Sequence, residues 1–353
     1  MFSWARPTPL HIPRRMGADR RVYIISDLHL GDGTRSDSFL SKDAELLALL
    51  EQVEREGAHL VIASDGVDFH QAWFITRVLK AHARVMGAFS RLAQKTGVTY
   101  IWGNHDHDIS VFRDLLRLDV CSSLELGDQV LIRHGYEYDP YIGPYLEQSH
   151  VATRVHHLYE RLAETWIRMP LENFYNASNR LTFWLFHKVV MASNAWGWIN
   201  SKLGRPQVGR RLDAAWKFWT QCQLGDPQCI FQYVREASLK GPHRWIITGH
   251  SHLPGVVHFS DSRSYANTGS WTFNSAQYAL WDGERVTVRD WITGRTYDDR
   301  AYKPLLDGRF QHMNFENWWA ENYLGYFRFR AEVERRLPVL DAAVTDRPAS
   351  LEG

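Results

Sequence analysis

The sequence has few cysteines, no uninterrupted apolar run of membrane-spanning length, no internal repeat and almost no excess of charge of one sign. Three cysteines among 353 residues exclude a disulfide scaffold or a cysteine-rich zinc module. Because 41 Lys and Arg face 40 Asp and Glu, no nucleic-acid partner is expected from net charge. A hydrophobic content of 44% instead predicts an ordinary globular chain with a sizeable core.

The N-terminal residues and the most apolar segment bear on location. Residues 1–21 contain arginines but no continuous apolar stretch, which is not typical of a secretory signal, and the low cysteine content favours the reducing cytoplasm. The most apolar segment, 181–199, carries His187 and Lys188 in its middle. Since charge is costly inside a bilayer, we expect this segment to be buried or to graze a membrane surface rather than to span it.

Short apolar runs alternate with helical patterns over residues 21–134, which predicts a layered α/β domain. Helices are expected in the segment that ends near Gly57 and over about 71–96. Strands are expected at 22–26, 59–64, 98–102, 124–126, 129–134, 244–249, 255–259, 264–269, 278–281 and 285–291.

A long insertion interrupts this pattern. The predicted core comprises 21–140 and 244–300, the insertion 141–243 has helical periodicity, and 301–353 reads as a helical tail. The insertion contains 12 Lys and Arg against 7 Asp and Glu, and six of the 15 tryptophans. We therefore expect a basic, Trp-rich helical cap, whose aromatic side chains suit either ordinary helix packing or contact with an amphiphile.

Part of the cap is a candidate substrate-binding surface. The run 202–211 could hold phosphates or anionic lipid heads, or form a solvated loop. The candidate contacts are Trp184, Lys202, Arg205, Arg210 and Arg211.

Five short segments place carboxylate, imidazole or amide side chains directly after apolar runs. They are Asp27-Leu-His29, Asp65-Gly-Val-Asp68, Gly103-Asn-His-Asp106, His134-Gly and Gly249-His-Ser-His252. Side chains two positions apart at a strand end can converge on one ion. Oxygen and imidazole donors without thiolates suit Mn²⁺, Fe²⁺ or Zn²⁺. Each segment alone is a weak signal, but their ordered recurrence predicts a divalent-metal site.

In this order, the five segments resemble the signature of the calcineurin-like metallophosphoesterase family, over about 21–291 without the insertion. The resemblance implies an α/β fold in which two packed sheets are flanked by helices. It implies two divalent ions, with Mn²⁺ as the first choice and Fe²⁺ or Zn²⁺ as alternatives. One ion would be held by Asp27, His29, Asp65 and His252. The second would share Asp65 and be held by Asn104, His134 and His250.

The resemblance also implies three catalytic residues. His105 would lie beside the scissile phosphate, Asp106 would orient His105, and Asp68 would support the site. Two such ions supply a nucleophile from water and neutralise phosphate oxygens, so the expected reaction is hydrolysis of a phosphoester or pyrophosphate. One position departs from the family pattern, because Ser64 replaces the glycine before the shared aspartate. A backbone that needs glycine there would be strained.

The residues in and around the motifs limit the kinds of substrate that are expected. The Ser/Thr protein phosphatases have Glu at the last position of the GNH[DE] motif and Arg directly after GDxxD. This chain has Asp106 and Phe69 at those two positions, so it does not resemble a protein phosphatase. The stretches 27–33, 67–73, 103–108 and 267–271 resemble the bacterial UDP-2,3-diacylglucosamine pyrophosphatase group. That resemblance implies a lipid-linked nucleotide diphosphate as substrate, UMP and a lipid phosphate as products, and peripheral attachment to the inner-membrane surface.

Two alternatives remain open. The best-known enzymes of that group carry Arg where this chain has His105, which leaves room for a soluble phosphodiesterase or nuclease of the same family. A non-catalytic scaffold with the same fold is the other alternative, and the complete set of ligands argues against it.

Overall fold

The chain divides into two compact units. The first comprises residues 1–158 and 225–312, and the second 159–224 and 313–353. The computed structural model describes residues 12–34, 37–39, 42–139, 142–143, 154, 157–158, 177–212, 227–272 and 275–307. The expected helices of the tail beyond residue 307, and the parts of the cap outside these ranges, lie outside the described residues.

The first unit contains a seven-stranded sheet. Its strands are β2 (Val22–Ile25), β3 (His59–Ile62), β4 (Val98–Ile101), β5 (Asp119–Cys121), β11 (Gln277–Trp281), β12 (Val286–Asp290) and β13 (Thr296–Tyr297). The order is β13-β12-β11-β2-β3-β4-β5. Strands β2 to β5 pair in parallel, so their carboxyl ends lie at one edge of the sheet.

The first unit also contains a six-stranded sheet. Its strands are β1 (Pro13–Met16), β6 (Ser123–Leu126), β7 (Val130–Ile132), β8 (Trp245–Thr248), β9 (Gly255–Ser260) and β10 (Arg263–Asn267). The order is β1-β6-β7-β8-β10-β9, and β7 and β10 both pair in parallel with β8. All ten expected strands are present. The sequence did not indicate β1, β5 and β13, because these are short and lack an uninterrupted apolar run.

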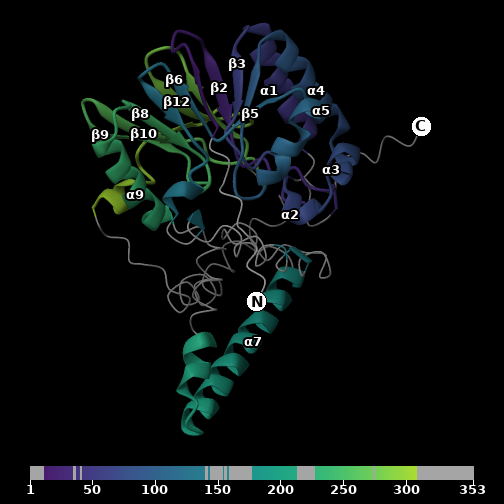
Figure 1. Cartoon of the computed structure of the whole chain (residues 1–353), viewed down its shortest axis with the longest axis vertical. Coiled ribbons are helices and arrows are strands. Elements are labelled where there is room, and N and C mark those ends of the chain that lie inside the picture. The colour runs from purple at the N-terminus through teal and green to yellow at the C-terminus, as the bar shows by residue number, and fades with distance from the viewer. Residues whose placement is uncertain are drawn as a thin grey trace. The chain divides into compact units, whose positions relative to one another are not determined.

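The two sheets pack face to face between layers of helices. Val22 and Ile24 of β2 point into the apolar layer between the sheets, whereas Tyr23 and Ile25 point to the opposite face. That outer face is covered by α1 (Asp43–Arg55) and α4 (Ala83–Lys95), and the other sheet is covered by α9 (Pro227–Lys240) (Figure 1). Burial on both faces explains why β2 is a continuous apolar run. The resulting four layers form the expected α/β sandwich.

The helix α9 lies in the sequence range of the expected insertion but packs in the first unit. Ile230, Phe231 and Val234 of α9 are buried against the six-stranded sheet, where they meet Ile246 and Tyr265. Their spacing of one and three residues places them on one helical face. The last helix before β8 is therefore part of the first unit.

The helix expected over 71–96 is interrupted twice. It comprises α2 (Phe69–Ala72), α3 (Ile75–Ala81) and α4. Trp73 ends α2 in a left-handed conformation with φ 66°. His82 lies between α3 and α4 and is held by carboxylates from elsewhere in the chain. Both interruptions depend on local conformation or tertiary contacts, which the apolar periodicity does not reveal.

The contacts of His82 predict a stability that depends on pH. Its ring nitrogens lie 3.2 Å from Asp37 Oδ2 and 3.0 Å from Asp43 Oδ1. Burial disfavours the charged ring, but the two carboxylates outweigh burial and raise the pKa of His82 to about 9. The protonated ring therefore stabilises the fold fully below about pH 6.5, and up to about 3 kcal/mol is lost as the pH rises through the folded-state pKa.

Urea unfolding of the wild type and His82→Gln at about pH 6 and about pH 10 measures this contribution. The free energy of unfolding should fall more steeply with pH in the wild type than in the variant. His258→Gln, which changes a histidine that contacts Ser264 rather than a carboxylate, is the matched control. Equal pH dependence in the wild type and His82→Gln would contradict the assignment.

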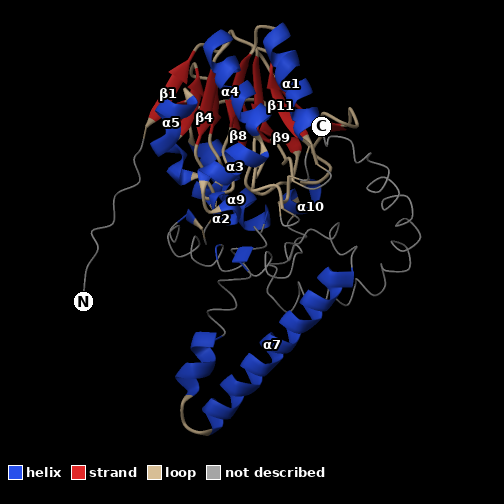
Figure 2. Cartoon of the chain, turned by 90° about the vertical axis from the view of Figure 1, so that its right-hand side faces the viewer, coloured by secondary structure: helices blue, strands red, loops and turns tan. Residues whose placement is uncertain are grey.

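In the second unit, the described residues form a helical hairpin. Helix α7 (Ala177–Lys202) is followed by a turn and by helical residues 206–212 (Figure 2). Gly204 adopts φ 75° in the turn, a conformation that glycine accommodates without steric cost. Within the described part of the chain, no helix is both long and apolar enough to cross a membrane.

Candidate metal centre

The five motifs lie at the carboxyl ends of neighbouring strands. Asp27 follows β2, Asp65 follows β3 and Asn104 follows β4 in the seven-stranded sheet. His134 follows β7 and His250 follows β8 in the six-stranded sheet. Because β2, β3 and β4 are parallel neighbours, as are β7 and β8, the motif loops of each sheet emerge at one edge.

Hydrogen bonds across the loops fix the backbone of the centre. The Asp27 amide donates to the Ser64 carbonyl at 2.9 Å, and the His29 amide donates to the Asp65 carbonyl at 2.8 Å. The His250 amide donates to Asp27 Oδ2 at 3.0 Å, which joins the two sheets. The side chains are therefore presented from a cross-linked backbone.

Most of the predicted ligands have unusual backbone conformations. Five of the seven have φ between 46° and 64°, in the left-handed region that non-glycine residues rarely adopt: Asp27, His29, Asp65, His250 and His252. Ser64 has φ 86°, so the serine occupies the left-handed conformation for which glycine is favoured. Such strain persists where the surrounding structure enforces it, and it concentrates at functional sites.

The residues assigned to the first ion lie together. Ligand atoms of Asp27, His29 and His252 lie within 4.8 Å of one another. His252 Nε2 is 3.1 Å from Asp27 Oδ1. Ligand atoms of Asp27, Asp65 and His134 also lie within 4.8 Å, which places Asp65 beside both predicted ion positions.

The residues assigned to the second ion meet around His134. Its Nε2 atom lies 2.9 Å from Asn104 Oδ1, 3.2 Å from Asp65 Oδ2 and 3.2 Å from His250 Nδ1. All seven predicted ligands therefore converge in one cluster, although they come from five segments of the chain.

The electrostatics of the cluster fit divalent cations. Asp27 and Asp65 are almost completely buried, and the ion pairs that the structure shows for them are with His252 and His134. Burial opposes ionisation, yet His252 and His134 hold the pKa of Asp27 at about 2, and His134 and His105 hold the pKa of Asp65 well below its usual value. Buried carboxylates that stay ionised require positive charge nearby. Oxygen and imidazole donors facing one another could meet this requirement with two bound cations.

The negative charge of these carboxylates also changes the pKa of His134. Burial disfavours its protonated form, but Asp65 and Asp27 outweigh burial and raise its pKa to about 10. A proton on His134 thus provides part of the positive charge that the carboxylates require. Metal ligands must be deprotonated, so binding of a cation here would release this proton.

Asp68 holds His105. Asp68 Oδ1 lies 3.2 Å from His105 Nδ1, and Oδ2 lies 3.0 Å from His29 Nδ1. Asp68 also caps α2 by accepting the amides of His70 and Gln71. Burial opposes ionisation of Asp68, but His105 and His157 hold its pKa well below the usual value. The supporting carboxylate of the sequence analysis therefore contacts both a predicted ligand and the predicted catalytic imidazole.

Asp106 has a different position from the one expected. Its carboxylate accepts the Gly103 amide at 2.7 Å, the Gly66 amide at 2.9 Å and the Tyr100 hydroxyl. Burial and the nearby Asp65 raise the pKa of Asp106 to about 7. Asp106 thus ties the loop after β3 to the loop after β4, and Asp68 takes the expected role of orienting His105.

Two contributors to the centre were not indicated by the sequence. Asp139 Oδ2 lies 3.1 Å from His250 Nε2, so this carboxylate can fix the ring whose Nδ1 faces His134. His157 is buried, and its Nε2 lies 3.7 Å from Asp68 Oδ2. Asp139 lies outside any of the five motifs, and the segment around His157 has no metal-ligand spacing, so neither offered a signal.

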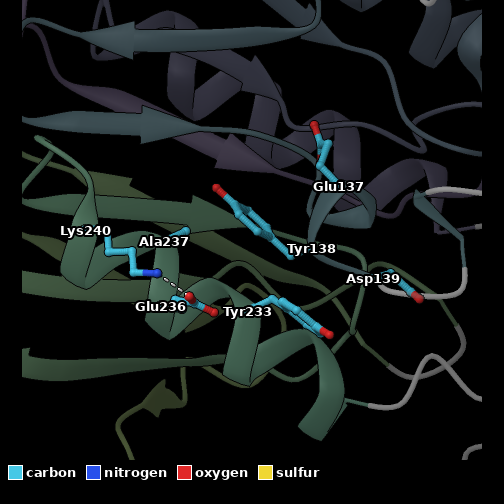
Figure 3. Close-up of a pocket in the computed structure, with 7 residues that line it drawn as sticks. All are labelled: Glu137, Tyr138, Asp139, Tyr233, Glu236, Ala237 and Lys240. Atoms are coloured by element: carbon cyan, nitrogen blue, oxygen red, sulfur yellow. Dashed lines mark hydrogen bonds and ion pairs between the residues drawn. The ribbon is translucent and has the colours of Figure 1, made fainter.

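A pocket of about 590 Å³ is lined in part by Asp139, whose carboxylate contacts His250 (Figure 3). Its lining residues come from α9 and from the turn after His134: Glu137, Tyr138, Asp139, Tyr233, Glu236, Ala237 and Lys240. Lys240 is paired with Glu236, which leaves two further carboxylates in the lining. An anionic phosphate is therefore poorly matched to this pocket and is expected at the metal cluster instead.

The candidate substrate contacts of the cap belong to the second unit. Lys202 ends α7, Arg205 lies in the turn, and Arg210 and Arg211 lie in the following helix; all four are exposed. Trp184 lies within α7, but its side chain is outside the described part of the structure. Their role in substrate binding stays a prediction.

Residues 20–254 match the model of the calcineurin-like phosphoesterase family. Among solved structures, the chain is similar to a dimetal phosphatase from Danio rerio at 13% identity, with a TM-score of 0.38. That match covers 79% of this chain and 98% of the other. A search of curated proteins finds no match.

Proposed function

The chain belongs to the calcineurin-like phosphoesterase family of metal-dependent hydrolases, and we propose that its cluster cleaves a phosphoester or pyrophosphate in a lipid-linked substrate. The convergence of seven buried or half-buried ligand side chains at two strand edges supports the proposal most directly. We assign one ion to Asp27, His29, Asp65 and His252, and the other to Asp65, Asn104, His134 and His250.

The protein side chains would share the catalytic work with the ions. When bound, two divalent ions supply a nucleophile from water and neutralise charge on the phosphate. His29 and His105 are both oriented by Asp68, so the first ion position and the proposed acid are set by one carboxylate. Asp139 orients His250 in the same way.

His105 is the proposed proton donor to the leaving oxygen. Burial lowers its pKa to about 4, so the ring is neutral near pH 7 before substrate binds. An adjacent phosphate anion would raise this pKa, and the nitrogen not facing Asp68 would then carry a proton toward the leaving oxygen.

The lipid-linked substrate is supported by the motif surroundings and by the cap. The stretches 27–33, 67–73, 103–108 and 267–271 resemble enzymes that act on UDP-2,3-diacylglucosamine, and the insertion is basic and rich in tryptophan. An anionic head with apolar tails matches that residue mix, and attachment to the inner-membrane surface from the cytoplasm follows from it. Mn²⁺ is the proposed metal, with Fe²⁺ or Zn²⁺ as alternatives.

One observation favours a second candidate. His105 stands where the best-known enzymes of the group carry Arg, and a neutral imidazole makes weaker contact with a diphosphate than a guanidinium does. A phosphodiesterase that acts on soluble diesters or nucleic acid is therefore the alternative function.

Product analysis separates the two candidates. Purified protein is incubated with Mn²⁺ and UDP-2,3-diacylglucosamine, and UMP release is followed by mass spectrometry. We expect kcat/KM to exceed that for the deacylated UDP-sugar at least about tenfold, because buried acyl methylenes add binding free energy. Bis(p-nitrophenyl) phosphate and single-stranded DNA are assayed in parallel. Turnover of these two alone would overturn the lipid substrate and leave the hydrolase intact.

A further inference from the structure

The end of the helical hairpin in the second unit carries exposed apolar and cationic side chains together. Trp198 is 64% exposed and Leu203 is 69% exposed, and Trp196 is also exposed. Lys202 lies over the Trp198 ring at 5.7 Å from its centroid, and Arg205 is exposed in the turn. Exposing large apolar side chains to water is unfavourable, so their concentration here indicates an interaction surface.

A close glycine contact organises this hairpin. A Cβ on Gly197 of α7 would lie 3.1 Å from Gly209 Cα in the following helix. The turn is closed by the Arg205 amide, which donates to the Asn200 carbonyl at 2.8 Å. The hairpin end is therefore a compact, hydrogen-bonded structure rather than a loose loop.

The exposed apolar side chains lie away from the glycine contact. At 3.6 residues per turn, they are offset by about 100–160° around the α7 axis from Gly197. They are Met191, Trp196, Trp198 and Ile199. The outer side of α7 is thus apolar near its end, while the inner side faces the second helix.

The charge of the hairpin is entirely of one sign. Residues 177–212 contain no Asp or Glu. Their cations are Arg180, Lys188, Lys202, Arg205, Arg210 and Arg211. Such a segment is attracted to an anionic surface, and it has no carboxylate that the surface would repel.

We propose that this hairpin end, defined by Trp196, Trp198, Leu203, Lys202 and Arg205, docks on the surface of an anionic phospholipid bilayer. Tryptophan favours the boundary between headgroups and acyl chains, and Lys and Arg reach headgroup phosphates while their methylenes stay in contact with apolar groups. The inference rests on the membrane attachment in the proposed function and specifies the element that provides it. The occupant is the bilayer itself and not the hydrolysed substrate.

Sedimentation with vesicles tests the proposal without any turnover. The full-length protein should bind vesicles of equimolar phosphatidylcholine and phosphatidylglycerol and should bind phosphatidylcholine vesicles at least about tenfold more weakly. Trp196→Ser/Trp198→Ser should lower the partition coefficient for the mixed vesicles at least about tenfold through lost apolar contact. Lys202→Glu/Arg205→Glu should lower it similarly, and added salt should weaken wild-type binding.

Matched controls carry the same changes on the first unit. Val111→Ser/Leu115→Ser removes two exposed apolar side chains, and Lys80→Glu/Arg84→Glu reverses two exposed cations. Both controls should bind vesicles as the wild type does. Circular dichroism verifies that each variant is folded.

Several outcomes would overturn the proposal. These are no binding by the wild type, equal binding to both kinds of vesicle, or wild-type binding by both hairpin variants. A lower melting temperature of Trp196→Ser/Trp198→Ser without lipid would show that another part of the chain covers the surface. Dissociation of an oligomer in that variant would show that a second copy does. Because hydrolysis of a soluble diester is measured separately, failure of the proposed function is recognised independently.

Discussion

Replacing Asp65 with alanine should lower turnover of bis(p-nitrophenyl) phosphate at least about a thousandfold and should release bound metal. Asp65 is assigned to both ions, and its Oδ2 lies 3.2 Å from His134 Nε2. Its Oδ1 accepts the His105 amide at 3.0 Å, so the same carboxylate also positions the loop that carries the proposed proton donor. Loss of this side chain therefore affects both ion positions and the catalytic loop together.

Metal analysis by mass spectrometry and steady-state kinetics measure the effect of Asp65→Ala. Treating the wild type with a chelator should reproduce the loss of turnover, and added Mn²⁺ should restore the wild type but not the variant. Asp128→Ala removes a carboxylate that is 91% exposed, and it should match the wild type in both measurements. An Asp65→Ala protein that keeps two ions and normal turnover would refute the assignment, as would normal turnover in Asn104→Ala.

Replacing Gly103 with alanine should cause the second-largest loss, at least about a hundredfold in kcat/KM. A Cβ at this position would overlap Ser64 Oγ and Asp65 Oδ1, and it would lie 2.8 Å from His134 Cδ2. These neighbours include two predicted ligands, and the serine occupies a left-handed backbone conformation. Since the surrounding loops are cross-linked by hydrogen bonds, the added methyl group must displace ligand side chains rather than find free space.

Gly87→Ala is the matched control. Gly87 lies in α4, where an added Cβ would have Arg91 Nη1 at 3.4 Å as its neighbour. This change should preserve kcat/KM and should raise the free energy of unfolding by up to about 1 kcal/mol, because alanine favours a helix over glycine. Retention of full activity and metal content by Gly103→Ala would show that the loop after β4 is more adaptable than the hydrogen bonds indicate.

The strands and their ends could be predicted because two-sided burial leaves a strong pattern. β2 and β3 face apolar layers on both sides, so each is mainly apolar, and a predicted ligand follows within three residues of its end. The parallel pairing that brings Asp27 and Asp65 together is a property of the sheet, and it follows from alternating strands and helices.

The parts that could not be predicted depend on contacts between distant residues. Asp68, and not Asp106, contacts the His105 ring. The Asp106 carboxylate instead accepts hydrogen bonds from the loop amides of Gly66 and Gly103, and these contacts cannot be foreseen from the sequence. The contact of Asp139 with His250 joins residues 111 positions apart and has no local pattern. Likewise, the helix breaks at Trp73 because its backbone is left-handed, and an apolar residue gives no sign of this in the sequence.

The backbone strain was predictable at one position only. Ser64 was indicated because the family pattern has glycine there, and its φ of 86° explains that preference. The left-handed conformations of Asp27, His29, His250 and His252 gave no such signal, because no glycine marks those positions. They are imposed by the cross-linked loops and not by the residues themselves.

Because the insertion separates the strands of the sandwich in the sequence, it determines when the enzyme can first fold during synthesis. The seven-stranded sheet needs β11 beside β2, and the six-stranded sheet needs β8 beside β7, yet β8 and β11 are made after residues 141–243. His250 and His252 lie between β8 and β11 in the chain. A nascent chain that ends before β8 therefore carries five of the seven predicted ligands without a completed pocket, and catalysis must await the synthesis of β11.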